Sequence, residues 1–266
     1  MILVTGSTGH IGNVLVRKLL ARGEKIRCLV LPQDDLTPLV GMDVEIVLGN
    51  VLDPSSLSKA LTGVTDVFHL AGMISIMPER DDLVHKVNVD GTRNMLEAAH
   101  KAGIRRLVYT SSIHALNRVP HGVVIDESVP FDPINAISSY DQSKAEASLL
   151  VKEAAQNGLN AVLACPTGVV GPYDYKGSEM GQVIMDSMGK GLNLYLDGAY
   201  DFVDVRDVAD GLILAWEKGK AGETYILSGE QISVERIVNF VKENIGLKPA
   251  RLKVPMRLAK FAARFT

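Results

Sequence analysis

The sequence predicts an α/β protein built on a doubly wound, mostly parallel sheet, with a smaller C-terminal lobe. Short β-branched runs alternate with longer helical patterns through the first half of the chain, which is typical of βαβ units. A glycine-rich turn joins the first expected strand to the first expected helix. The chain has 266 residues, of which 47% are hydrophobic, so it is long and apolar enough to bury a large core.

Charge excludes one broad class of partner. The chain carries 28 Lys and Arg residues against 31 Asp and Glu residues, a net charge of −3. This balance gives no general basic field for nucleic acid, so we expect no nucleic-acid binding.

The elements of the first half follow from their periodicity. Strands are expected at 2–5, 26–31, 44–48, 67–70 and 106–110, where short apolar runs end in turn residues. Helices are expected at 11–22, 54–61 and 83–101, and proline at position 54 suits a first helical turn.

The second half is less regular. Residues 117–136 carry no clear period and are expected to form a long loop, followed by a helix at 138–156 and a strand at 160–165. Beyond Pro166 we expect a helix at 181–188, short strands around Leu194 and Tyr225, and a helix capped by Ser233. We therefore divide the chain into a dinucleotide-binding domain at 1–165 and an interwoven, short or truncated substrate lobe at 166–266.

Cysteine usage and apolar run lengths indicate the compartment. Cys28 and Cys165 lie far apart in hydrophobic runs, without the spacing of a disulfide framework or a zinc site, so we expect no metal. No signal peptide and no apolar run of roughly 20 residues is present. A soluble, cytoplasmic protein without a membrane span is expected.

The glycine-rich turn indicates a Rossmann-type dinucleotide site. Gly6 suits a tight turn, Gly9 lets the backbone approach a pyrophosphate, and Gly12 lets the helix pack on the strand. The helix N-terminus offers unpaired N–H groups to the phosphates. The expected cofactor contacts here are Gly6, Thr8, Gly9, His10, Ile11 and Gly12, with His10 as a neighbour of the phosphates.

Tyr140 and Lys144 form the most informative pair. They lie four residues apart on an expected helix, so both side chains project from one face. A nearby ammonium stabilises a phenolate, which lets the tyrosine exchange a proton with a substrate oxygen. A hydroxyl from Ser112, or alternatively from Ser111, is expected as the third catalytic group.

These motifs resemble the short-chain dehydrogenase/reductase superfamily, specifically its extended branch, the NAD-dependent epimerase/dehydratase superfamily. The turn TGSTGHIG at 5–12, the run TSS at 110–112 and the pair in YDQSK at 140–144 occur in the order of that branch. They look most like dihydroflavonol-4-reductases and 3β-hydroxysteroid dehydrogenases. The resemblance implies an oxidoreductase that uses NAD(P) to interconvert a secondary alcohol and a ketone.

The resemblance also implies roles for individual residues. Ser112 maps onto the catalytic serine, 28 residues before Tyr140, and Asn88 onto an asparagine that braces the turn after the fourth strand and helps orient Lys144. Further cofactor contacts implied by the family motifs are Asn50, Val51, Leu70, Ala71, Gly72, Thr110, Ser111, Tyr140, Lys144, Pro166, Thr167 and Val169.

The choice between NAD and NADP stays open on the sequence. An acid at the end of the second strand would bind the ribose of NAD, and an arginine would accommodate the 2′-phosphate of NADP. Val30 and Leu31 stand in those places, whereas Asp34 and Asp35 follow in a loop and are expected to be solvated. Asn50 replaces the usual aspartate of the adenine-contacting segment, and its amide oxygen is expected to accept from the adenine.

Two further sets of residues complete the expectations. The segment at 201–209 matches a signature of the extended branch, and its acids and Arg206 are expected to form a buried network. Residues near the motifs suggest a mostly apolar substrate pocket, namely Met73, Ile74, Met77, His114, Leu116 and Tyr173.

Two other functions remain open. A nucleotide-sugar epimerase or dehydratase would use the same machinery and would need groups such as Lys176, Arg251 and Arg257 to hold a diphosphate. A non-catalytic NAD(P)-binding regulator is the second alternative. The small-molecule partner is thus a ketone or alcohol, or else a nucleotide sugar, and the family resemblance suggests a homodimer.

Overall fold

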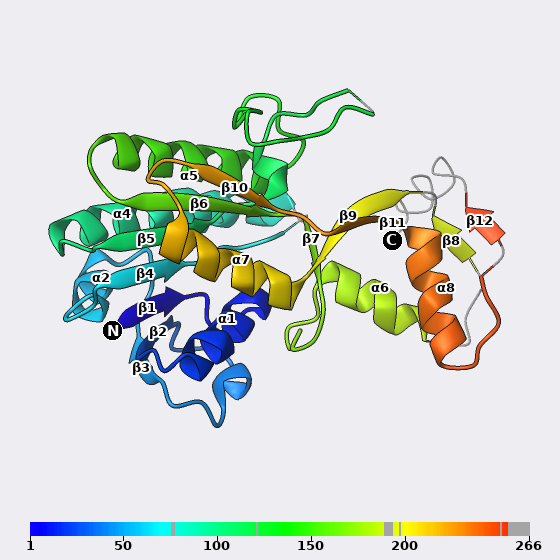
Figure 1. Cartoon of the computed structure of the whole chain (residues 1–266), viewed down its shortest axis with the longest axis horizontal. Helices are drawn as coiled ribbons and strands as arrows, with labels where there is room; N and C mark the ends of the chain where they lie inside the picture. Colours follow the sequence, from blue (N-terminus) through cyan, green and yellow to red (C-terminus); the bar gives the residue numbers. More distant parts are fainter. Residues whose placement is uncertain (76–77, 121, 189–193, 197, 251, 255–266) are drawn as a thin grey trace.

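Seven parallel strands form the centre of the molecule, in the order β10-β6-β5-β4-β1-β2-β3 (Figure 1). The computed structural model describes residues 1–75, 78–120, 122–188, 194–196, 198–250 and 252–254. The strands are β1 (Ile2–Thr5), β2 (Ile26–Val30), β3 (Glu45–Leu48), β4 (Asp66–His69), β5 (Arg106–Thr110), β6 (Ala161–Pro166) and β10 (Thr224–Leu227). The order reverses between β1 and β4, the place where α/β sheets bind ligands. The predicted fold class is confirmed.

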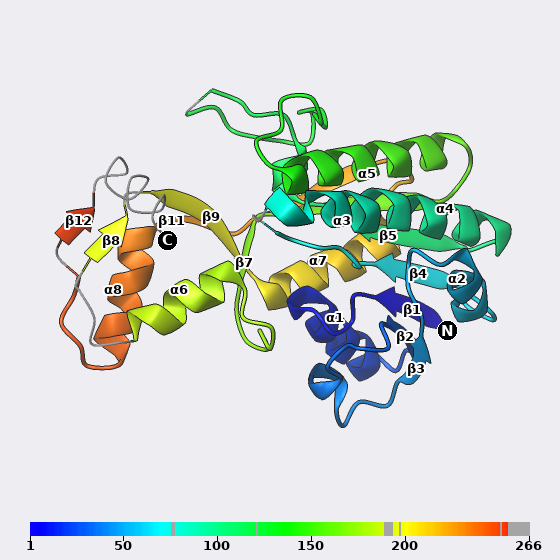
Figure 2. The same cartoon turned by 180° about the vertical axis from the view of Figure 1, so that it is seen from behind.

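Helices cover both faces of this sheet. On one face lie α1 (His10–Ala21) and α7 (Val205–Lys218), and on the other α2 (Pro54–Ala60), α4 (Gly91–Lys101) and α5 (Ser139–Gln156) (Figure 2). Buried Leu15 and Leu212 belong to the first core, and Leu57 and Met95 to the second. Because both faces are covered, β1, β4 and β6 are buried along their whole length and β5 is buried from Leu107 on, as parallel strands are in α/β proteins.

Side-chain caps set the start of several helices. Asp53, Ser138 and Asp204 each accept a backbone N–H two or three residues further on, at the starts of α2, α5 and α7. Ser233 does the same for α8 (Val234–Asn244) by accepting from the N–H of Arg236, so the predicted cap is confirmed.

The remaining elements gather beyond one end of the sheet (Figure 1). A three-stranded sheet joins β11 (Glu230–Ser233), β9 (Ala199–Asp204) and β7 (Gly168–Val170), while β8 (Leu194–Leu196) pairs with β12 (Leu252–Val254) beside α6 (Glu179–Ser187) and α8. Between β9 and β11 the chain returns to the large sheet. There α7 covers one face of the sheet and β10 adds its edge strand. Residues from both sides of position 165 therefore build that sheet, and the division into two domains stays a prediction.

Two local predictions need correction, and one helix was missed. The helix expected at 83–101 is divided into α3 (Asp81–His85), a π-helical turn (Lys86–Asp90) and α4. Helix α7 was not expected, although Asp204 as cap, an acid in the first turn and apolar residues at helical spacing are its signals. The prediction of a buried network around Arg206 is wrong, because this side chain is 61% exposed and pairs with Asp204 at the start of α7.

Neither a membrane segment nor a metal cluster is found in the described part of the chain. None of its helices is both long and apolar enough to cross a bilayer. No group of three or more His, Cys, Asp and Glu side chains is arranged to hold a metal ion within the same residues. Cys28 and Cys165 are buried free thiols, as their apolar surroundings in the sequence predict.

Asp66 ties the sheet to its outer layers. Its carboxylate accepts hydrogen bonds from Thr65, Arg105 and, at 3.0 Å, the indole of Trp216 on α7. Burial alone would raise the pKa of Asp66, but the hydrogen bonds from Arg105, Thr65 and Trp216 outweigh it and lower the pKa. This carboxylate therefore stabilises the fold while it is charged.

We predict that Asp66→Asn lowers the free energy of unfolding by about 1–3 kcal/mol at neutral pH, because charge-assisted hydrogen bonds are lost. The native pKa is below the unfolded one, so the contribution is present above the ordinary Asp pKa of about 4 and fades as the pH falls further. Urea unfolding at several pH values measures both effects. Asp90→Asn is the control, since its pair with Arg93 is exposed; equal losses in both variants would contradict the role of Asp66.

Candidate active site

The glycine turn and the turn after β4 touch through their backbones. Gly6 has φ +69°, and a Cβ at this position would lie 2.7 Å from the carbonyl carbon of Leu70. Only glycine fits both the conformation and the space. The following helix α1 begins at its N-cap, Gly9, which makes no side-chain capping bond. Its first N–H groups therefore remain available to an anion.

A buried hydrogen-bond network fixes this contact. The Thr5 hydroxyl bonds Nδ1 of His69 at 2.8 Å and accepts the N–H of Ala71 at 3.0 Å, while Nε2 of His69 bonds the Thr92 hydroxyl. Burial, and then the charge of Lys144, lower the pKa of His69 to about 3, so its ring is neutral at physiological pH. The network holds Leu70, Ala71 and Gly72 beside the glycine turn.

Asn88 braces the same turn from the other side. It lies in the π-helical segment, where its amide accepts from the N–H of Met73 at 2.8 Å and donates to the Met73 carbonyl and the Ser143 hydroxyl. A Cβ on Gly72 would lie 3.1 Å from Oδ1 of Asn88 and 3.8 Å from Nζ of Lys144. Asn88, Gly72 and Lys144 are thus brought together.

Lys144 is a buried cation. Its Nζ donates to the carbonyl of Thr110 at 2.7 Å and lies 4.7 Å from the centre of the Tyr109 ring. Burial lowers its pKa from 10.5 to about 8, so the ammonium form still predominates at neutral pH. A positive charge is therefore held at the carboxyl end of β5, one helical turn from Tyr140.

Tyr140 and Ser112 meet beside it. Burial raises the pKa of Tyr140 to about 12, whereas a hydrogen bond from Ser112 acts in the lowering direction. The Ser112 oxygen also accepts the backbone N–H of His114, which leaves its proton for the Tyr140 oxygen or for a substrate oxygen beside it. The Ser111 hydroxyl instead bonds Ser148 inside the protein, at 2.6 Å. Of the two serines left open by the sequence, the geometry favours Ser112.

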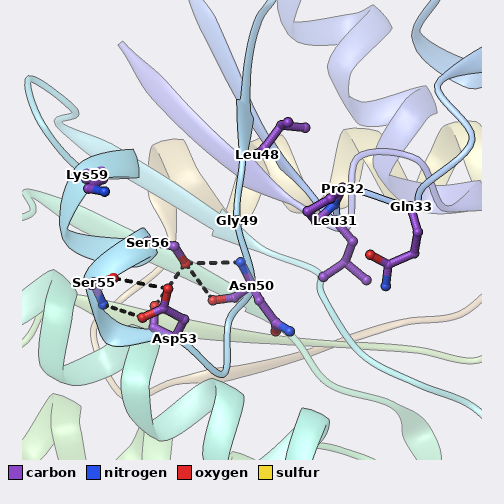
Figure 3. A pocket seen from close by; sticks show the side chains of 10 residues that line it. All are labelled: Leu31, Pro32, Gln33, Leu48, Gly49, Asn50, Asp53, Ser55, Ser56 and Lys59. Carbon is purple, nitrogen blue, oxygen red and sulfur yellow. Dashed lines mark hydrogen bonds between the residues drawn. The ribbon is translucent and has the colours of Figure 1, made fainter.

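A pocket of about 450 Å³ lies at the carboxyl ends of β2 and β3 (Figure 3). Leu31, Pro32 and Gln33 line one side, Asp53, Ser55, Ser56 and Lys59 the other, with Leu48, Gly49 and Asn50 between them. Asn50 lines it as expected of an adenine contact, but its Oδ1 already accepts the N–H of Leu52 at 2.9 Å. The side chain of Val51 packs in the core against Gly91 instead of lining the pocket.

The segment after β6 runs along the carboxyl edge of the sheet. Pro166 ends β6, and the backbone N–H of Ser111 bonds the carbonyl of Ala164 on that strand. Thr167 donates to Asp201 at 2.7 Å and Val169 lies in β7, which pairs with β9. These contacts hold the segment at the carboxyl edge of the sheet, where its backbone was expected to meet the cofactor.

A group of contacts around Thr8 was missed by sequence reasoning. Asp34, expected to be solvated, is only partly exposed and accepts from the Thr8 hydroxyl and the Leu31 N–H, both at 3.3 Å. Lys176 donates to the same hydroxyl at 3.2 Å. The carbonyl of Pro172 bonds His10, which ties the loop 171–177 to the start of α1. The position of Asp34, 22 residues after Gly12, was the available signal.

The residues predicted to line the substrate pocket lie in different parts of the structure. The prediction that Leu116 lines the pocket is wrong, because Leu116 is 5% exposed and packs in the core beside Phe131. Tyr173 stacks under Arg17 near the glycine turn. Met73 follows Gly72 against Asn88, Ile74 is exposed, and His114 lies 3.8 Å from the carboxylate of Asp141. Met77, Arg251 and Arg257 lie outside the described residues.

Comparison with known proteins gives a consistent result. The model of the "NAD dependent epimerase/dehydratase family" matches residues 2–228. "Sterol demethylase protein B" of Methylococcus capsulatus is 38% identical over 96% of this chain and 78% of its own. A farnesyl-dihydroquinoline-oxide ketoreductase of Stigmatella aurantiaca is 28% identical over 98% and 78%. The NAD complex of UDP-glucose 4-epimerase from Thermus thermophilus superposes with a TM-score of 0.81, at 27% identity, over 96% and 86%.

We predict that Lys144→Met stabilises the protein at neutral pH by about 1–3 kcal/mol, because it removes the cost of burying an ammonium. The depressed native pKa makes this cost complete below about pH 8. The gain should therefore fade between pH 8 and the unfolded value of 10.5. Thermal and urea unfolding measure it. Lys152→Met, on the same helix, should change stability by under about 0.5 kcal/mol; a destabilised Lys144→Met would contradict the interpretation.

Proposed function

The chain belongs to the NAD-dependent epimerase/dehydratase family, and from this premise we propose that it interconverts a secondary alcohol and a ketone by hydride transfer. Membership makes it an NAD(P)-dependent oxidoreductase of the extended short-chain dehydrogenase/reductase type. The direction of the reaction and the substrate are our proposals.

One observation carries the proposal. Ser112, Tyr140 and Lys144 converge at the carboxyl end of β5, and Gly72 leaves the turn after β4 open beside Lys144. Glycine at this position makes room for a ligand between that turn and the catalytic group. The nicotinamide, when bound there, supplies or accepts the hydride.

Ser112 and Tyr140 are proposed to act on the substrate oxygen. Ser112 donates a hydrogen bond to the carbonyl oxygen, and Tyr140 gives its phenolic proton to that oxygen as the carbonyl carbon is reduced. The raised pKa keeps Tyr140 protonated at neutral pH, which suits the reductive direction. In the other direction Tyr140 must first lose this proton, which the neighbouring Lys144 ammonium favours.

Lys144 and Asn88 would hold the geometry for this step. Lys144 keeps its charge in place through the Thr110 carbonyl, so the phenolate is stabilised without rearrangement. Asn88 connects Met73 after β4 to Ser143 on α5, the helix that carries Tyr140 and Lys144. It is a positioning residue in this proposal.

The substrate is proposed to be a ketone on an apolar molecule. Apolar Met73 and Ile74 follow the open turn directly. The ketoreductase relative acts, by its name, on a farnesylated ketone.

We also propose a cytoplasmic location and a homodimer through α4 and α5, where Leu149 is exposed.

Replacement of Tyr140 by Phe tests the mechanism. We expect kcat for ketone reduction to fall by about 10²–10⁴-fold, because the proton donor is lost. Binding of NADH or NADPH, followed by fluorescence titration, should stay within about twofold, since the ring keeps its place. A variant that binds the cofactor and keeps its turnover would overturn the role of Tyr140. An unmodified protein that binds the cofactor but reduces no ketone would instead favour a non-catalytic regulator.

A nucleotide-sugar epimerase or dehydratase remains the second candidate, because the epimerase of Thermus thermophilus shares the fold over 96% of this chain. In such enzymes the cofactor is regenerated within each turnover. We predict instead that each molecule of ketone reduced consumes one molecule of NAD(P)H, measured by absorbance against chromatographic product yield. Product formation from nucleotide sugars without net change in the cofactor would favour the second candidate.

A further inference from the structure

The end of β2 lacks the residues that usually choose between NAD and NADP. Leu31, directly after the strand, has no polar group, and Pro32 follows it. A ribose or a 2′-phosphate at this corner would have to be recognised by other side chains. Three such side chains meet here: Thr8 from the glycine turn, Asp34 from the loop after β2, and Lys176 from the loop after β7.

Asp34 is held in one orientation. Its Oδ2 accepts from the Thr8 hydroxyl and from the Leu31 N–H, so the carboxylate turns back toward the glycine turn instead of into solvent. Its Oδ1 lies 3.8 Å from the Lys176 ammonium and can accept a further hydrogen bond. The Asp34 side chain is 21% exposed, so the protein does not enclose the carboxylate completely.

The corner adjoins the pocket proposed for the adenine. Leu31, Pro32 and Gln33 line that pocket and lead directly into Asp34 (Figure 3). Thr8 lies within the turn whose neighbouring N–H groups face the expected pyrophosphate. A ribose that joined an adenine in this pocket to a pyrophosphate at the glycine turn would pass beside Thr8 and Asp34.

We propose that Asp34 selects NAD by accepting a hydrogen bond from the 2′-hydroxyl of the adenosine ribose. The inference rests on the dinucleotide site of the proposed function and adds the choice of cofactor. A carboxylate accepts from a diol and repels a phosphate dianion. Lys176 offsets part of that repulsion, but it is already engaged with Asp34 and Thr8. Arg17 is likewise engaged, with the Pro38 carbonyl and the Tyr173 ring.

Calorimetric titration with NAD⁺ and NADP⁺ tests the choice. We expect the unmodified protein to bind NAD⁺ at least about tenfold more tightly than NADP⁺. Asp34→Asn should reduce this ratio by about tenfold, because the repulsive charge is lost. Asp35→Asn is the matched control: its carboxylate is exposed and bonds only Thr37 among the described contacts, so the ratio should change less than about twofold.

A second measurement needs no variant. 5′-AMP and 2′,5′-ADP differ only by the 2′-phosphate, and we expect the unmodified protein to prefer 5′-AMP. Equal or tighter binding of NADP⁺, or a ratio unchanged in Asp34→Asn, would overturn the role of Asp34 and leave the proposed function standing. Failure to bind either dinucleotide would overturn the dinucleotide site and the proposed function together.

Discussion

The backbone contact between the turn after β1 and the turn after β4 is the constraint on which the site depends. Gly6 can approach Leu70 and Ala71 only because it has neither a side chain nor a barrier to positive φ. The same approach places Gly72 against Asn88 and Lys144. The end that would hold a pyrophosphate and the end that would transfer a proton are thus fixed relative to each other by one contact in the middle of the sheet.

Burial of charge follows from this arrangement. Lys144 lies at the carboxyl edge of β5, one helical turn from Tyr140, and there it loses its hydration, which lowers its pKa to about 8. The Thr110 carbonyl and the Tyr109 ring offset part of the free-energy cost of this lost hydration. The neighbouring His69 stays neutral, so it adds no second charge to the interior. The burial of this ammonium therefore costs the folded state free energy.

Local spacing explains which parts could be predicted from sequence. The strands, the glycine turn, and Tyr140 with Lys144 depend on neighbours within one turn or one strand. The distinction between Ser111 and Ser112 depends instead on Ser148, 37 residues away, and the burial of Leu116 on its pairing with Phe131. Asp34 was misjudged because a loop acid is usually hydrated, whereas here Thr8, 26 residues earlier, draws it inward. A contact between a loop and a distant segment leaves no periodic pattern in the sequence, so it could not be predicted.

The loop 171–177 contacts the glycine turn although it lies beyond position 165. This loop follows β7, yet Pro172, Tyr173 and Lys176 bond His10, Asn13 and Thr8 at the start of α1. Tyr173 accepts a left-handed φ of 69° in doing so, a strained conformation for a side chain of this size. Such strain persists only where surrounding contacts determine the backbone, here the hydrogen bond from Asn13 and the stacking of Arg17. Residues beyond 165 thus pack on the glycine turn as well as building the sheet, and a division of the chain by sequence would separate Lys176 from the Asp34 carboxylate that it faces.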